Sequence, residues 1–288
     1  MKTEKQYKDI DNIKNELGSV INDFHKIDQR MIAIGLDYNQ YFRKSISNKT
    51  IYSLRDNIIY RLNATKLHIE ILTNLLDALD GELTSMYEQK DGGRNVHLHF
   101  SDRKTDISAL FDSVIFHIIS AFDYVSILVS YVCIHNDKKL KWTNLAKSSR
   151  DEKNPFSKLS AGKLINTLDR EFIGRLYDHR SYLIHIGQEN RSTGYSIDLL
   201  KGEVKAKIIS SNQFNKNFSK LRNEEQDFSI TYILFWLLNE TTASILKIQF
   251  SIKEYMEQNK EIDRPLFYTK SSANENIPIT KDIWDSKE

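Results

Sequence analysis

Apolar residues recur at steps of three and four along most of the chain, and this spacing is typical of helices with one buried face. The first stripe predicts a helix over about residues 5–30: Ile10, Ile13, Leu17, Val20, Phe24 and Ile27. A polar, aromatic link follows over residues 37–48. A second stripe predicts a helix that stops at Asp91-Gly92-Gly93: Ile51, Leu54, Ile58, Leu62, Ile69, Leu72, Leu76, Leu79, Leu83 and Met86.

The most buried helix is predicted over roughly residues 104–136, where apolar residues follow one another with few interruptions. Ser101 or Asp102 stands where a capping residue is expected at its start. Just before it, the alternating residues 95–100 predict a short strand. The charged and helix-breaking residues 137–157 indicate a surface connection.

After this connection the sequence predicts one more helix, a hairpin and a last long helix. The first of these ends near Gly187 and has this apolar stripe: Leu159, Leu164, Leu168, Phe172, Leu176, Leu183 and Ile184. Alternation around Lys201-Gly202 predicts a β-hairpin with strands over about 195–200 and 203–209 and a two-residue turn. The last helix covers about residues 226–259 and stops before Asp263-Arg264-Pro265.

Together these elements predict an all-α fold, an up-and-down bundle of about five long helices with a small β-hairpin insertion. The expected organisation is an N-terminal helix and connection over 1–49, a helical domain over 50–260 that carries the hairpin at about 195–209, and a polar tail over 261–288. In this tail, Trp284 is the expected docking anchor.

Composition agrees with a helical, globular chain. Among 288 residues, 40% are hydrophobic, 28% are charged and only three are proline, which excludes disorder over most of the length and favours long helices. The net charge of +2 disfavours nucleic-acid binding through overall charge alone, although it permits a local basic groove. The single cysteine, Cys133, excludes an internal disulfide and a cysteine-rich zinc site, and it indicates a reducing, cytoplasmic location.

Neither a membrane span nor a targeting segment is expected. Residues 109–134 are long enough to cross a bilayer, but they contain Asp112, His117 and Asp123. No second apolar segment or flanking basic collar accompanies them, so they predict a buried core helix, with His117 as a core histidine. The first residues, MKTEKQYKDIDNIKNE, lack the apolar stretch of a secretory signal.

Several familiar chemistries have no motif in this chain. It has no phosphate-binding glycine-rich loop, no GxSxG, no HExxH and no CxxC. His97 and His99 are two residues apart on the predicted strand, so they would face the same side, as metal ligands do. A third ligand is missing nearby, so solvated loop histidines are the competing interpretation, and neither a metal nor another cofactor is expected.

The segment LYDHRSYLIHIG, residues 176–187, contains the residues with the clearest chemical potential, Arg180 and His185. A guanidinium can hold a phosphate with two parallel hydrogen bonds, and an imidazole can transfer protons near neutral pH. Random placement would give about one such pair in a chain of this composition. Two other pairs do occur, Arg94 to His99 and Arg61 to His68, but only Arg180 and His185 lie near the end of an apolar helix.

In an ideal helix, a separation of five residues corresponds to a rise of about 7.5 Å and a net turn of about 140°. The side chains of Arg180 and His185 therefore diverge within one chain. A two-fold dimer could bring both pairs into one shared cleft.

With this motif, the chain resembles the HEPN superfamily, whose helical domains carry R-x4-6-H with a polar residue after the arginine. Here that residue is Ser181, where Asn or Asp is more typical. The apolar helix segment 117–129 is similar to the helix that often precedes the motif helix in this superfamily. The resemblance covers roughly residues 50–260 and consists of two short motifs and a helix order.

The resemblance implies a homodimeric, metal-independent endoribonuclease, a hydrolase that acts as a toxin or as an antiviral (phage-defence) effector. His185 would be the general acid or base, and Arg180 would stabilise charge on the phosphoryl group. Other members bind RNA or nucleotides without cutting them, so the alternative is a non-catalytic helical module for RNA, a nucleotide or a protein. A toxin would also need a silencing partner, an antitoxin or a nucleotidyltransferase. A third interpretation is an accidental pair in a purely structural protein.

Residues around the motif have both functional and structural interpretations. Asp123 could orient His185 or pair with Arg180, or it could be a buried structural partner for either of them. Asp178 and His179 could assist substrate binding or belong to a solvated helix face.

The residues expected to contact RNA also have both a functional and a structural interpretation. Ser181 could touch the phosphate or act as a cap, and Tyr182 could stack on a base or belong to the core. Basic residues of the hairpin and of the preceding connection could guide RNA or be solvated: Lys201, Lys205 and Lys207, and Lys138, Lys139, Lys141, Lys147 and Arg150.

Overall fold

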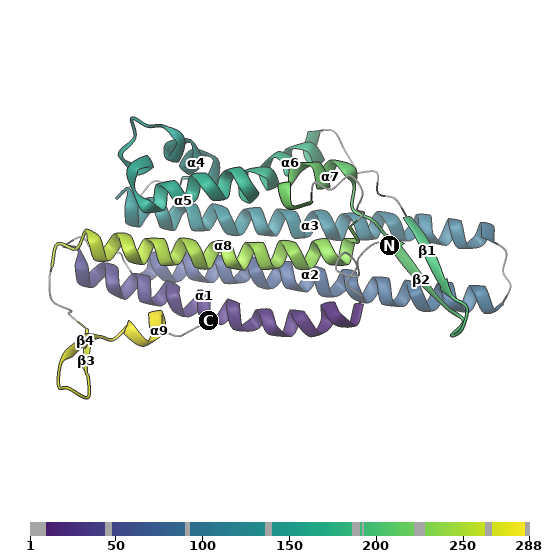
Figure 1. The fold of residues 1–288 in the computed structure, drawn as a ribbon, viewed down its shortest axis with the longest axis horizontal. Helices are drawn as coiled ribbons and strands as arrows, with labels where there is room; N and C mark the ends of the chain where they lie inside the picture. Colours follow the sequence, from purple (N-terminus) through teal and green to yellow (C-terminus); the bar gives the residue numbers. More distant parts are fainter. Residues whose placement is uncertain are drawn as a thin grey trace. The chain divides into compact units, whose positions relative to one another are not determined.

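A computed structural model describes residues 10–43, 48–89, 93–135, 140–185, 191, 193–221, 228–262 and 267–285. Four long helices dominate the fold: α1 (Ile10–Tyr41), α2 (Asn48–Glu88), α3 (Gly93–Cys133) and α8 (Ile230–Gln258) (Figure 1). A fifth helical run consists of α5 (Ser160–Leu168), a π turn (Asp169–Ile173) and α6 (Gly174–His185). The chain is therefore all-α with a small β insertion, as predicted.

Contacts along the first three helices show that they alternate in direction. Between α1 and α2, Asp28 lies 3.5 Å from Arg55, and a Cβ added to Gly35 would contact Ile51. Later residues of α1 thus contact earlier residues of α2, so the two helices are antiparallel. Between α2 and α3 the pattern is the same: the rings of His68 and His117 are 4.9 Å apart, and Glu82 lies 3.2 Å from Arg103.

The remaining two runs continue this alternation. Arg180 of α6 packs on Phe116 of α3, and Arg191, beyond α6, pairs with Asp112 of α3, so α6 is antiparallel to α3. Gln249 of α8 donates from Nε2 to the Ile27 carbonyl of α1 at 2.9 Å, and the N–H of Glu261, beyond α8, donates to the Tyr41 carbonyl at 2.8 Å. Because α8 runs in the same direction as α1, the five helices form the predicted up-and-down order.

The described residues form two compact units, and each of the four long helices is divided between them. The α6 unit comprises residues 1–20, 63–118 and 175–240, and the α4 unit comprises residues 21–62, 119–174 and 241–288. Predicted apolar stripes are buried in both units, as shown by Ile13 and Leu17 in the first and Ile27 and Ile58 in the second.

A β-hairpin is the main non-helical element of the α6 unit, and its turn differs from the prediction. β1 (Thr193–Asp198) pairs antiparallel with β2 (Glu203–Ile208), and α7 (Asn212–Asn217) follows. A four-residue turn, 199–202, joins the strands instead of two residues. The reason is that Asp198 Oδ1 accepts the N–H of Leu200 at 3.0 Å and of Lys201 at 3.3 Å, while Gly202 adopts a φ of 70°.

Two helices of the α4 unit lie where the sequence predicted irregular structure. The predicted connection 137–157 contains α4 (Trp142–Arg150), followed by a 3₁₀ turn (Pro155–Lys158). The buried residues of α4 stand among polar and charged residues, so their helical spacing is hard to recognise in the sequence: Trp142, Leu145, Ala146 and Ser149. The predicted polar tail forms β3 (Tyr268–Lys270), β4 (Asn276–Pro278) and α9 (Lys281–Asp285).

Trp284 of α9 is the predicted anchor of this tail. Its ring is buried, and its indole N–H donates to Asp37 Oδ2 at 2.8 Å, while Thr280 donates to Oδ1. Asp37 and Tyr38 lie inside α1, which extends to Tyr41. The predicted link from residue 37 is therefore wrong over its first part, because α9 covers the polar residue that suggested a loop.

The predicted strand over residues 95–100 is also wrong, since these residues begin α3. Six alternating residues are too few to separate a strand from a helix, and the buried positions from Phe100 to Ile107 and beyond recur at helical steps. Ser101 and Asp102 consequently lie within the helix instead of capping it.

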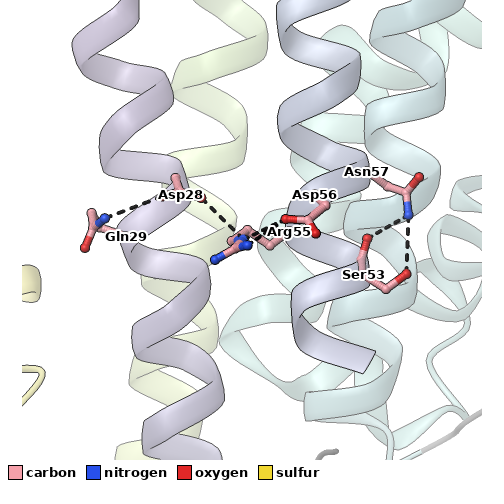
Figure 2. Close-up of polar contacts among 6 residues, drawn as sticks. All are labelled: Asp28, Gln29, Ser53, Arg55, Asp56 and Asn57. Carbon is pink, nitrogen blue, oxygen red and sulfur yellow. Dashed lines mark hydrogen bonds and ion pairs between the residues drawn. The ribbon is translucent and has the colours of Figure 1, made fainter. Parts of the chain in front are cut away.

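An exposed polar cluster connects α1 with the start of α2 in the α4 unit (Figure 2). Arg55 donates to Asp56 Oδ1 at 2.7 Å and lies 3.5 Å from Asp28, and its guanidinium is 4.9 Å from the Tyr52 ring. The carboxylate of Asp56 raises the pKa of Arg55 through this hydrogen bond. The cluster ties two helices together at their surface.

One described helical stretch, Arg103–Cys133, is long and apolar enough to cross a membrane, with a mean hydropathy of 1.7 in its most apolar window. In this structure 61% of that window is buried by the rest of the fold. Such burial is typical of the core helix of a soluble protein, in agreement with the prediction for this segment.

Candidate functional site

A π turn precedes α6, the helix that carries the motif residues. Its wide hydrogen bond runs from the Gly174 N–H to the Asp169 carbonyl. A Cβ at position 174 would lie 2.4 Å from that carbonyl oxygen, so the position requires glycine. The predicted helix to Gly187 is two α-helices; Gly187 itself lies outside the described residues.

Arg180 is held against an aromatic ring. Its side chain is half-buried, and its guanidinium carbon lies 5.6 Å from the ring centre of Phe116 on α3, which is 36% exposed. A cation above a ring face is attracted by the ring quadrupole. Among the residues that the structure describes, no carboxylate forms an ion pair with Arg180. The guanidinium is thus oriented by packing, and no described carboxylate takes up its hydrogen-bond donors.

His185 is the last residue of α6 and is exposed. Arg180 and His185 lie on the same helix, as the sequence predicted. Five residues of helix direct the two side chains about 140° apart, so they do not converge within one chain. A shared cleft between two copies remains a prediction.

His179 occupies the opposite environment from His185, although both belong to α6. It is fully buried, with its ring 4.9 Å from Phe214 of α7 in an edge-to-face arrangement. The pKa of His179 is lowered to about 4, first because burial disfavours the charged imidazolium and second because of the positive charge of Arg191. His179 is therefore neutral at physiological pH and belongs to the core of the unit, not to the solvated face that the sequence suggested.

The other motif neighbours are more accessible. Asp178 is exposed and lies 3.9 Å from Arg175, one helical turn earlier. Ser181 is exposed beside Arg180, while Tyr182 is half-buried with its ring stacked on His179 at a centroid distance of 6.4 Å. Ser181 is thus placed where it could meet a bound phosphate, and Tyr182 has only part of its ring available for a base.

Asp123 belongs to the α4 unit, where it has a structural role. Its Oδ1 accepts the backbone N–H of Trp142 at 3.1 Å, at the first turn of α4. A carboxylate at a helix N-terminus satisfies an N–H that has no partner within the helix. Asp123 is half-buried here, and every role that the sequence suggested for it, functional or structural, involves Arg180 or His185, so those roles remain predictions.

The predicted basic residues fall into two groups. On the hairpin, Lys201, Lys205 and Lys207 are all exposed. Before and along α4, Lys141, Lys147 and Arg150 are exposed too, and Arg150 lies 3.6 Å from Asp169. Lys138 and Lys139 lie outside the described residues.

Three aromatic or charged contacts around α6 were missed by the sequence reasoning. Phe116 supports Arg180, Phe214 covers His179, and Arg191 forms an ion pair with Asp112 at 3.4 Å. The Arg191 side chain is 1% exposed and its guanidinium lies 4.5 Å from the Phe111 ring. One signal was available, because a charged residue such as Asp112 inside an apolar helix requires a partner.

The histidine pair considered for a metal is not arranged as predicted. His97 and His99 belong to α3, so the strand alternation on which the pair rested is absent, and the side chain of His97 lies outside the described residues. The imidazole of His99 instead pairs with Glu82 of α2, which lowers the pKa of that carboxyl. Over the described ranges, no group of three His, Cys, Asp or Glu side chains is placed to hold a metal ion.

A cavity of about 600 Å³ lies in the α6 unit between α2, the hairpin and the start of α8. Its lining includes Asp77, Asp80, Thr84, Glu203, Lys205 and Thr231. Asp80 Oδ1 accepts the N–H of Ala206 at 2.6 Å, yet burial still raises the pKa of Asp80. None of the motif residues lines this cavity, so it is separate from the Arg180–His185 site.

Comparisons of this chain with models of protein families, with curated proteins and with solved structures give no match. Function is therefore inferred from the side chains themselves.

Proposed function

We propose that this protein is a metal-independent endoribonuclease that acts as a homodimer, with Arg180 and His185 of both copies in one interface cleft. The observation that carries the proposal is the contrast along α6: His179 is buried and neutral, whereas His185 is exposed on the same helix as an arginine oriented by Phe116. The accessible imidazole and guanidinium are the two groups that phosphodiester cleavage requires.

In this mechanism the nucleophile comes from the RNA. His185 of one copy removes the proton from a ribose 2′-hydroxyl, the 2′-oxygen attacks phosphorus, and the bond from phosphorus to the 5′-oxygen breaks. His185 of the second copy donates a proton to the departing 5′-oxygen. The products are a 2′,3′-cyclic phosphate and a 5′-hydroxyl. Arg180 stabilises the negative charge that grows on the phosphoryl oxygens.

Other residues near the motif fit RNA binding. Ser181 and Asp178 are exposed on α6 beside Arg180, and Tyr182 offers part of its ring for stacking. Lys201, Lys205 and Lys207 are exposed cations on the hairpin of the same unit, which suit contacts with phosphates. The single, buried cysteine and an RNA substrate together favour a cytoplasmic location, where a toxin or defence effector would act.

The test is cleavage of a mixed RNA pool by purified protein in excess EDTA. Replacing His185 by Ala is expected to lower the rate about 100-fold to 10,000-fold, because one proton-transfer group is lost. The matched control is His25→Ala, which removes an exposed histidine from α1 and should leave the rate unchanged. Arg180→Lys keeps the charge but loses the planar fork, so we expect a loss of about tenfold or more. Arg175→Lys on the same helix is its control.

Two outcomes would reject catalysis. If the protein binds RNA but never cleaves it, and Lys205→Glu weakens this binding, the non-catalytic RNA-binding module becomes the better description. Ser181 is the feature that favours this alternative, since it stands where Asn or Asp is more typical of the resemblance. If the Arg180 and His185 variants change neither binding nor toxicity in cells, the pair is accidental.

A further inference from the structure

The outer edge of strand β1 is open, although the hairpin is otherwise well bonded. In an antiparallel pair, successive residues direct their N–H and C=O groups alternately toward and away from the neighbouring strand. On β2, the N–H groups of Val204 and Ala206 point away from β1, since they donate to Thr84 and Asp80 of α2. Their partners across the ladder, Ile197 and Tyr195, therefore direct their own N–H and C=O groups away from β2.

The two edges of the hairpin are thus treated differently. Side chains of α2 satisfy the β2 edge, with distances of 2.9 Å from Val204 N to Thr84 Oγ1 and 2.6 Å from Ala206 N to Asp80 Oδ1. Within the described part of the chain, no third strand pairs with β1. An open edge is a template for another strand, and β1 carries no Lys or Pro of the kind that blocks such pairing.

The side chains of β1 add an apolar surface to this open edge. Tyr195 and Ile197 are on the same face as Ala206 and Val204, because directly opposed residues share a face. Val204 is buried against the unit, but Tyr195 is 46% exposed and Ile197 is 37% exposed. In the turn, Leu199 and Leu200 are even more exposed, and Figure 1 shows the turn reaching past α2.

We propose that β1 pairs antiparallel with β1 of a second copy of this chain, with the two-fold axis at Ser196. This register joins the two hairpins into one four-stranded sheet. Tyr195 of each copy then faces Ile197 of the other, and both residues have backbone groups on the open edge to form the ladder. Aromatic and β-branched residues are favourable cross-strand neighbours, so the strand is complementary to itself in this register.

Charge complementarity supports a second copy as the occupant. On the other face of the hairpin, Lys207 is opposite Gly194, and Asp198 is opposite Glu203, which places two like charges side by side. In the proposed register, Gly194 faces Asp198 of the second copy. A Cβ at Gly194 would meet nothing within 4 Å, so the long Lys207 side chain can cross this position to reach that carboxylate. The pairing relieves the like-charge contact twice by symmetry.

This pairing does not depend on Arg180, His185 or cleavage, and its test has a separate readout. Ser196 would face its own equivalent across the axis in a non-hydrogen-bonded pair, where Cα atoms are about 4.5 Å apart and a disulfide fits. Ser196→Cys is expected to give a disulfide-linked dimer of twice the 33.7 kDa chain mass on mild oxidation. The native Cys133 is buried and its thiol pKa is raised by burial, so it does not compete.

The matched control is Lys205→Cys, which is exposed on the same face but one strand further from the axis in each copy, so it should form several times less linked dimer. Adding Ile197→Lys to Ser196→Cys should abolish the cross-link while circular dichroism stays helical, because a lysine on this edge opposes pairing. Lys207→Glu should weaken self-association about tenfold, whereas Lys201→Glu in the turn should not.

Three results would overturn the proposal. One is equal cross-linking of Ser196→Cys and Lys205→Cys, which would show that collisions and not a register bring the cysteines together. Another is unlinked Ser196→Cys at concentrations where the protein self-associates, which would assign self-association to a different surface. An extended peptide of another protein would be the occupant if the chain stays monomeric at every concentration and the open edge binds such a peptide.

Discussion

Two sets of polar groups, one in each unit of this protein, lie in opposite environments. In the α4 unit, the buried carboxylates Asp37 and Asp169 each accept an indole N–H, from Trp284 and Trp142, at 2.8 Å. In the α6 unit, the groups with chemical potential stay accessible: an exposed imidazole at the end of α6, a half-buried guanidinium on an exposed ring, and an open strand edge. The first arrangement consumes hydrogen-bonding capacity inside the fold, and the second keeps it for another molecule.

This difference distinguishes polar groups that stabilise the fold from polar groups that are available to bind another molecule. A buried carboxylate requires partners, because transfer out of water costs several kcal/mol unless hydrogen bonds replace the lost hydration. Such a pair locks helices together but offers nothing to a ligand. An exposed histidine or open edge contributes little to folding, yet each can bind without first breaking an internal contact. We therefore expect substitutions in the first class to change the free energy of unfolding, and those in the second to change cleavage or association.

The largest effect is expected at Trp142, which is fully buried. Its ring packs on Phe122 at a centroid distance of 5.5 Å, and its N–H donates to Asp169. Trp142→Ala should lower the free energy of unfolding by about 3–5 kcal/mol, because it leaves a cavity and removes the donor from a buried carboxylate. Urea denaturation followed by circular dichroism measures this change.

Trp142→Phe sharpens the same prediction, since it keeps one aromatic ring in the core while it removes the indole N–H together with part of the bicyclic ring. A loss of about 1–3 kcal/mol is expected, because Asp169 loses this hydrogen bond and keeps only its ion pair with Arg150. If the phenylalanine variant were as stable as the parent, the hydrogen bond to Asp169 would not be a source of stability, and the contrast between the units would be one of packing alone.

The second prediction concerns His179, the buried histidine of the α6 unit. Its pKa in the folded protein is about 4, against an ordinary value of 6.5, so the unfolded chain binds the proton first as pH falls. Stability should decrease between pH 6.5 and pH 4 and level off below that range. At pH 4.5 the loss from this residue is about 2–3 kcal/mol relative to pH 7.5.

His179→Phe isolates this contribution, because phenylalanine fills a similar space beside Phe214 and does not titrate. Other groups also titrate in this range, so the comparison is between the pH dependences of the two proteins and not between their absolute stabilities. Parallel curves for parent and variant would mean that His179 has no depressed pKa. The cleavage assay at pH 7.5 should be unchanged, provided that the variant is folded.

Much of the fold was readable because long helices repeat their signal. The α2 stripe from Ile51 to Leu83 contains enough buried positions to fix the helix, whereas the short alternation at residues 95–100 fits two structures equally well. The sequence failed at α4 for a different reason. Its nine residues have four buried positions among polar and charged neighbours, and contacts with the distant residues Phe122 and Asp169 hold Trp142 in place.

The candidate site was readable in part. The types and spacing of Arg180 and His185 were sufficient to single them out and place them on one helix. Their environments were not readable, because these depend on residues far away in the sequence. Phe116 lies 64 positions before Arg180, and Phe214 of α7 buries His179. A histidine next to a charged motif therefore appeared solvated when it is in fact in the core.

The smallest effect is expected at Arg55. This residue tests whether the loss of unfolding free energy depends on how deeply a polar contact is buried or on the unit in which it lies. Arg55 belongs to the α4 unit, as Trp142 does, but its ion pairs with Asp28 and Asp56 lie at the surface (Figure 2). Arg55→Ala should cost about 0.2–1 kcal/mol of unfolding free energy, and less in 1 M salt, since exposed pairs are screened. Asn57→Ala, one helix position away from the ion pairs, is the control. A salt-independent loss as large as that of Trp142→Phe would show that this cluster anchors α1 to α2 as firmly as the buried tryptophan contacts anchor α4.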